Sequence, residues 1–132
     1  MKSRDTLIRL KRFQSEEKYR RITQIEAMIA EFGRMIAELD SEIAGEEQRL
    51  GITNPSHFAY STYARAARSR RDNLRNSAEE LGEQLAAAQA ELEEARAELH
   101  RVESLEVREK GLDRTASLAT KVSQQDFDPH RA

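Results

Sequence analysis

Residues 22–43, ITQIEAMIAEFGRMIAELDSEI, carry the pattern that decides the fold. Their large apolar side chains recur at alternating steps of three and four residues, at Ile22, Ile25, Ile29, Phe32, Ile36, Leu39 and Ile43, and Leu50 continues this row one heptad later. This spacing is the heptad signature of a coiled-coil seam, the apolar stripe that one helix presents to another. Upstream of Ile22 the same heptad positions are occupied by the polar residues Lys11, Ser15 and Lys18. The beginning of the chain therefore follows the seam pattern less strictly. The sequence predicts a helix over about residues 3–50.

A break follows at residues 50–58, LGITNPSHF. Gly51 can adopt the left-handed conformation that ends many helices, and Asn54 followed by Pro55 is typical of the start of the next one. A second seam then keeps heptad spacing through Tyr60, Ala64, Ala67, Arg71, Leu74, Ala78, Leu81, Leu85, Ala88, Leu92, Ala95, Leu99 and Val102. A short turn, 51–54, between two long amphipathic helices forces them to run antiparallel.

The predicted fold is therefore all-α, with two long helices forming an antiparallel coiled-coil hairpin over residues 1–110. The second helix is expected to span about residues 55–110, because its apolar heptad pattern weakens towards residue 110. Residues 111–132 contain Gly111, a run of Ser and Gln, and Pro129, and we expect them to be a frayed or disordered tail.

Charge supports an antiparallel pairing. If residue 50 faces residue 55, residue i faces about residue 105 − i, and the basic first 21 residues lie beside the acidic run Glu83–Glu103. The arginines within 65–75 then lie beside Glu31, Glu38 and Asp40. Each exposed pair contributes only tenths of a kcal/mol, but the pattern disfavours slipped and parallel registers.

Composition excludes several classes of protein. The chain has 132 residues, which is at most one domain, and its 5% aromatic content suits a thin seam better than a thick core. Cysteine is absent, so neither disulfides nor thiolate metal sites are expected, and a reducing cytosol suits the chain. No stretch approaches the roughly 18 apolar residues that span a bilayer, and no apolar segment follows Met1 as in a signal peptide.

No catalytic, cofactor-binding or metal-binding constellation is apparent. The histidines at 57, 100 and 130 fall at the turn, the far end and the tail of the predicted hairpin, so they cannot share a metal ion. Glycines occur singly, which excludes a phosphate-cradling loop. We expect no enzymatic activity and no cofactor.

The stretch 57–71, HFAYSTYARAARSRR, allows more than one interpretation. Ala66-Ala67, with Leu74 and Leu81 beyond, is similar to the basic region of a leucine-zipper DNA-binding protein. Tyr63 stands where that motif needs its base-reading Asn, however, so no nucleic-acid partner is expected. The alternative is that the arginines form a solvated face paired with acidic residues of the opposite helix.

The aromatic residues of the turn, Phe58, Tyr60 and Tyr63, also allow two roles. They can plug the open end of the hairpin, and they can anchor a partner protein together with the neighbouring Arg65 and Arg68. Both roles stay open, because a two-helix protein cannot bury three rings completely.

Three segments together resemble the FliJ family of flagellar type III export proteins, over roughly residues 1–115. They are MKSRDTLIRLKRFQSEEKYRRI at 1–22, GITNPSHFAYSTYARAARSRRDNL at 51–74, and the Leu-, Ala- and Glu-rich return helix. Heptads match one another easily, so the more specific parts are LIRLKRF at 7–13 and the turn with its aromatic residues.

The resemblance implies a cytoplasmic coiled coil similar to the stalk of a rotary ATPase. Such a stalk sits in the export ATPase ring, promotes its assembly and activity, and contacts an export-gate membrane protein and export chaperones. It associates peripherally with the inner-membrane export apparatus and does not insert into the bilayer.

We expect Arg4, Arg9 and Arg12 to contact the ring, and Phe58, Tyr60, Tyr63, Arg65 and Arg68 to form the docking surface at the turn. The alternative is a scaffold or chaperone-like hairpin with no ATPase partner, which would use only the bend at residues 51–63.

Overall fold

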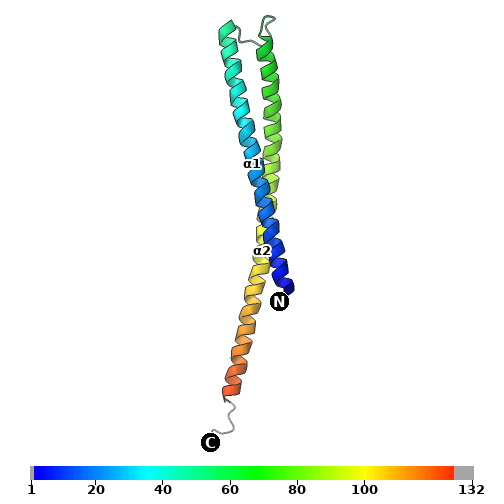
Figure 1. The fold of residues 1–132 in the computed structure, drawn as a ribbon, viewed down its shortest axis with the longest axis vertical. Helices are drawn as coiled ribbons and strands as arrows, with labels where there is room; N and C mark the ends of the chain where they lie inside the picture. Colours follow the sequence, from blue (N-terminus) through cyan, green and yellow to red (C-terminus); the bar gives the residue numbers. More distant parts are fainter. Residues whose placement is uncertain (1, 127–132) are drawn as a thin grey trace. The chain divides into compact units, whose positions relative to one another are not determined.

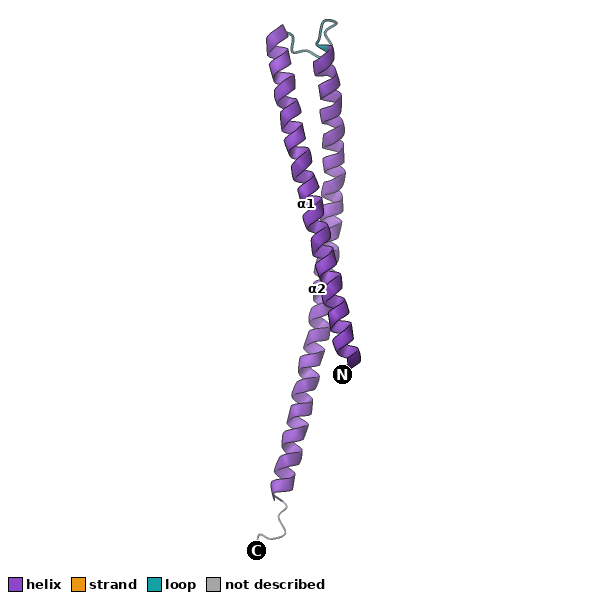
Figure 2. Ribbon diagram, viewed as in Figure 1, coloured by secondary structure: helices purple, strands orange, loops and turns teal. Residues whose placement is uncertain are grey.

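The computed structural model describes residues 2–126, which form two long helices joined by one connection (Figures 1 and 2). Helix α1 spans Lys2–Leu50 and helix α2 spans Thr62–Asp126. No strand occurs in this described part of the chain. The predicted all-α hairpin of two long helices is confirmed.

The chain divides into two compact units, each of which packs part of α1 against part of α2. Unit 1 consists of Met1–Glu16 and Glu93–Ala132, and unit 2 of Glu17–Leu92. In both units the partners in cross-helix contacts run in opposite directions along the sequence, as Arg4–Glu109 and Lys11–Glu98 do in unit 1 and Lys18–Glu91 and Arg71–Asp40 do in unit 2. The two helices are therefore antiparallel within each unit.

The predicted seam forms the core. In unit 2, Ile22, Ile25, Leu81, Ala88 and Leu92 form a buried cluster, with Ile29, Phe32 and Leu85 packed against it. Every residue of the two predicted seam rows except Leu50 is buried or half-buried. Mixing Ala on α2 with Ile on α1 suits this packing, because small residues leave holes for large ones. Leu50, one heptad after Ile43, is 40% exposed and lies outside the core.

The connection between the helices is longer than the sequence predicted. Gly51 has φ +71° and its N–H donates to the Glu47 carbonyl at 2.8 Å, so it ends α1 as expected. Asn54, however, does not cap α2. Its side-chain oxygen accepts from the Ser56 N–H at 3.0 Å and its carbonyl from the His57 N–H at 3.0 Å, which makes a turn.

Ser61 is the residue that caps α2. Its hydroxyl oxygen accepts from the Ala64 N–H at 3.1 Å, three residues into the helix, which satisfies one of the free donors of the first turn. The predicted turn at 51–54 and helix start near 55 were therefore wrong, and residues 51–61 connect the two helices.

The longer connection changes which residues face one another. The cross-helix ion pairs depart from the 105 − i relation by four to ten residues, as in Lys18–Glu91, Arg4–Glu109 and Arg12–Glu103. These departures average about seven residues, which is the length of one heptad. A shift of one heptad leaves the same seam rows in contact, which is why the predicted core survives a wrong register.

Helix α2 also continues farther than predicted. It remains helical to Asp126, across most of the segment expected to be a frayed tail, and residues 127–132 lie outside the described residues. Residues 111–126 contain two Leu, two Ala, two Gln, one Arg and one Lys, all of which favour a helix. In unit 1, Arg4 pairs with Glu109, so α2 runs on beyond the start of α1 (Figure 1). Residues 107–119 are all exposed.

The seam predicts a sharp difference between two neighbouring apolar residues of α1. Ile25 is 2% exposed and Met28 is 48% exposed. Ile25→Ala should lower the free energy of unfolding by about 2–4 kcal/mol, because it leaves a cavity in the core. Met28→Ala should change it by about 1 kcal/mol or less. Urea unfolding followed by circular dichroism measures both, and equal losses would show that the seam is misassigned.

Candidate partner-binding surfaces

Two carboxylates at the end of α1 hold the start of α2 in place. Glu47 accepts a hydrogen bond from the Tyr60 hydroxyl at 3.3 Å and lies 3.7 Å from the Arg68 guanidinium. Glu46 accepts from the Ser61 hydroxyl at 3.1 Å and pairs with Arg49 at 2.7 Å. These contacts tie the cap of α2 to α1, and so they set the geometry of the turn.

Glu46 and Glu47 were missed by the sequence reasoning, although the sequence carries a signal for them. Two acidic residues in the last turns of a helix oppose its dipole and are unfavourable there on their own. Their presence at the end of α1 indicates that other groups use them, and the structure identifies those groups as Tyr60, Ser61 and Arg68.

The three aromatic residues of the turn divide between the two predicted roles. Tyr60 is 5% exposed and its ring lies under the Arg65 guanidinium at 5.5 Å, so it plugs the hairpin. Tyr63 is 56% exposed, and its hydroxyl donates to Glu42 at 2.8 Å, which raises the pKa of Tyr63. Phe58 is 95% exposed and stacks only on the His57 ring, with centroids 4.8 Å apart. Of the three, Phe58 has the ring most open to a partner.

Several arginines of the 65–75 stretch are paired with acidic residues of α1. Arg68 lies against Glu47, while Arg71 and Arg75 share Asp40 at 3.0 and 3.4 Å. Arg71 additionally pairs with Asp72 of its own helix. This arrangement agrees with the prediction that these arginines form a face of α2 that pairs with acidic residues of the opposite helix. Arg70 is exposed and forms no ion pair within the described part of the chain.

The basic residues near the N-terminus also differ from one another. Arg4 pairs with Glu109, and Arg12 pairs with Glu103 at 3.5 Å, so both help to join α1 to α2 in unit 1. Arg9 is exposed and forms no ion pair among residues 2–126. Of these three predicted contact residues, Arg9 is therefore the one whose charge the fold does not use.

Exposed apolar residues lie on either side of Arg9 in the sequence, and they were not among the predicted site residues. Leu7, Leu10 and Phe13 are 40%, 49% and 55% exposed, whereas Ile8 between them is buried in the seam. We call Leu7, Arg9, Leu10 and Phe13 the N-terminal patch. The signal for it was available, because extending the seam back from Ile22 in heptads reaches Ile8 and leaves these three apolar residues outside it.

Within the described residues, no three His, Asp or Glu side chains come together in a way that could hold a metal ion. No helix in that part of the chain is long and apolar enough to cross a membrane. The surfaces that remain as candidates for function are the N-terminal patch and the turn with Phe58.

Comparison of the chain with protein-family models, with curated proteins and with solved structures finds no match. The chain's own residues and their arrangement are therefore the basis for the function proposed below.

The turn should be sensitive to acid through Glu46. The hydrogen bond from Arg49, followed by that from Ser61, lowers the pKa of Glu46 below 4.5, although partial desolvation opposes the change. A carboxylate with a lowered folded-state pKa stabilises the fold above its unfolded-state value, and this contribution is lost as pH falls through the lowered value. Carbon-detected NMR titration should place the Glu46 midpoint below 4.5.

Two variants test the cause of that shift. Arg49→Ala should move the Glu46 midpoint upward, because it removes the strongest hydrogen bond to the carboxylate. Arg34→Ala, which removes the equivalent partner of Glu31 elsewhere on α1, should leave Glu46 unchanged. A native midpoint at or above 4.5 would contradict the contacts described for the turn.

Proposed function

We propose that this chain is a non-enzymatic component of a flagellar type III protein-export apparatus and acts as a stalk in the export ATPase ring. In this role it promotes assembly and activity of the ring, and it contacts an export-gate membrane protein and export chaperones. The proposal rests on the resemblance of residues 1–22 and 51–74 to the FliJ family and on one structural observation, the N-terminal patch.

The N-terminal patch supports the proposal because the hairpin does not need it. Leu7, Leu10 and Phe13 contribute little to the seam, which Ile8 continues at this level. Three exposed apolar side chains within seven residues, near an Arg9 that has no ion pair within residues 2–126, are typical of a surface that another protein covers. The patch also lies in the LIRLKRF segment that carries much of the resemblance.

Unit 1 offers a surrounding protein two kinds of surface. The patch is on α1, and the part of α2 beyond Glu109 runs on without α1 beside it. That part of α2 exposes Leu112 and Leu118 among charged residues of both signs. A ring closing around this end would contact both helices, as a stalk requires. We assign the contact with the export gate to the turn, where Phe58 is almost fully exposed.

The test uses the export ATPase of the same organism. The chain should raise its rate of ATP hydrolysis and its ring assembly while hydrolysing no ATP alone. The double variant Leu10→Ala/Phe13→Ala should weaken the apparent affinity by about tenfold or more, as expected for the loss of interface anchors. Arg9→Glu should weaken it too, and added salt should reduce the contribution of Arg9.

Phe58→Ala is the matched control, because it removes an exposed aromatic ring from the turn instead of the patch. It should leave ATPase stimulation unchanged and weaken binding to the export gate. Arg4 and Arg12 are poor test residues, since their ion pairs with Glu109 and Glu103 join the helices. An ATPase indifferent to the wild-type chain in rate and assembly would refute the stalk proposal. The scaffold or chaperone-like hairpin would then replace it.

A further inference from the structure

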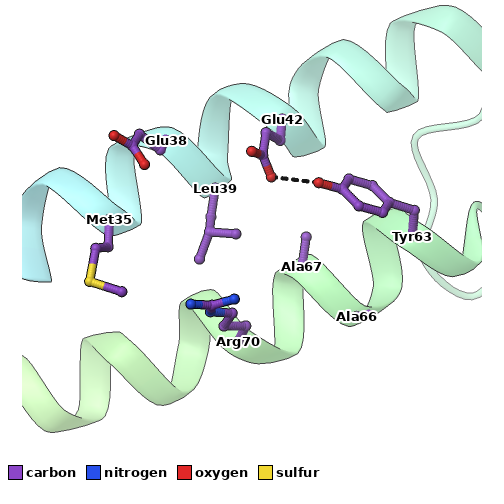
Figure 3. Close-up of a pocket in the computed structure, with 8 residues that line it drawn as sticks. All are labelled: Met35, Glu38, Leu39, Glu42, Tyr63, Ala66, Ala67 and Arg70. Atoms are coloured by element: carbon purple, nitrogen blue, oxygen red, sulfur yellow. Dashed lines mark hydrogen bonds between the residues drawn. The ribbon is translucent and has the colours of Figure 1, made fainter.

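A groove of about 340 Å³ lies between α1 and α2 in unit 2, on one side of the seam (Figure 3). Its apolar lining comes from Met35 and Leu39 of α1 and from Ala66 and Ala67 of α2. The small alanine side chains leave room along α2, and the flexible side chain of the half-buried Met35 can adapt to different partners. The groove therefore has the size and lining to accept side chains from outside the hairpin.

The seam beneath the groove is incompletely covered. Phe32, Ile36, Leu39 and Leu74 are only half-buried, whereas Ile25 in the core cluster is almost fully buried. Two helices alone cannot cover these side chains from both sides. Additional helices packed on this face would remove more apolar surface from water, which is favourable.

The two rims of the groove carry opposite charges that the hairpin leaves unpaired. Glu38 on α1 and Arg70 on α2 are both exposed, and neither forms an ion pair within residues 2–126. Glu42, also on α1, accepts the hydrogen bond from Tyr63 (Figure 3). A surface with an acidic rim on one helix and a basic rim on the other can match a second copy of itself.

The opposite side of the seam provides a contrast. A groove of about 510 Å³ there is lined by charged residues that already pair across it, Arg68 with Glu47 and Arg71 with Asp40. Of these two grooves, only the one lined by Glu38 and Arg70 has charged side chains at its edges that form no ion pair within residues 2–126.

We propose that a second copy of this chain covers the groove lined by Met35, Leu39, Ala66 and Ala67. The two copies are related by a two-fold axis parallel to the helices of unit 2, which makes a four-helix bundle in which neighbouring helices are antiparallel. This inference goes beyond the proposed function and does not depend on it.

Two face-to-face dimers are possible, one with its two-fold axis parallel to the helices and one with the axis across them. The charges at the edges of the groove favour the parallel axis. A two-fold axis parallel to the helices places α1 of one copy against α2 of its partner at the same level. Glu38 then faces the partner's Arg70, and Arg70 faces the partner's Glu38. A two-fold axis across the helices would instead place α1 against α1 and bring acidic rims together, which is unfavourable.

Sedimentation velocity over a range of concentrations tests the proposal with a charge exchange. The wild-type chain should show a concentration-dependent monomer–dimer equilibrium. Glu38→Arg and Arg70→Glu should each weaken the dimer by about tenfold or more, since each puts like charges at two symmetric contacts. The double variant Glu38→Arg/Arg70→Glu should restore dimerisation, because the exchanged charges again face opposite partners.

Glu83→Arg is the control. It makes the same change in net charge as Glu38→Arg but lies on another side of α2 from Arg70, about 220° around the helix, and it should leave the dimer intact. Circular dichroism should show unchanged helix content in all variants. A wild-type chain that stays monomeric at every concentration would overturn the proposal and leave the groove to a different protein. Single variants that dimerise normally, or a double variant that does not recover, would overturn it as well.

Discussion

The structure depends on a single apolar seam between two antiparallel helices. Ile22 and Ile25 of α1 pack with Leu81, Ala88 and Leu92 of α2 in one buried cluster. A pair of helices can bury only the stripe along which they meet. Within the described residues, apolar side chains outside that stripe stay at least partly in water, and the most exposed of them, such as Phe58, indicate where another molecule can bind.

The seam was predictable from the sequence, but the register was not. Heptad spacing identifies the residues that face the other helix, and all of them except Leu50 are buried or half-buried. A displacement of one helix by seven residues brings the same rows together, so the pattern alone cannot distinguish the two registers. The turn decides between them, and it contains two cap-like signals, Asn54 with Pro55 and Ser61 with Thr62. The second one is the helix cap, because Asn54 uses its polar groups within the connection.

The candidate surfaces were predictable only in part, for a related reason. Residue type suggested that Phe58, Tyr60 and Tyr63 were equivalent, but the carboxylates at the end of α1 engage the hydroxyls of the two tyrosines and leave Phe58 exposed. Arg9 similarly differs from Arg4 and Arg12 because α2 supplies carboxylates only to the latter two. Such distinctions depend on cross-helix contacts, and these follow from the register that the sequence left open.

Zero-length carbodiimide coupling of the native chain tests the hairpin and its register most directly. The reagent joins a lysine amine to a carboxylate that touches it, and mass spectrometry identifies the joined residues. The structure predicts links within one chain between Lys11 and Glu98, which are 2.6 Å apart, and between Lys18 and Glu91, which are 3.5 Å apart. A dominant link between Lys11 and Glu91, one heptad earlier, would contradict the eleven-residue connection, and links found only between chains would contradict the hairpin.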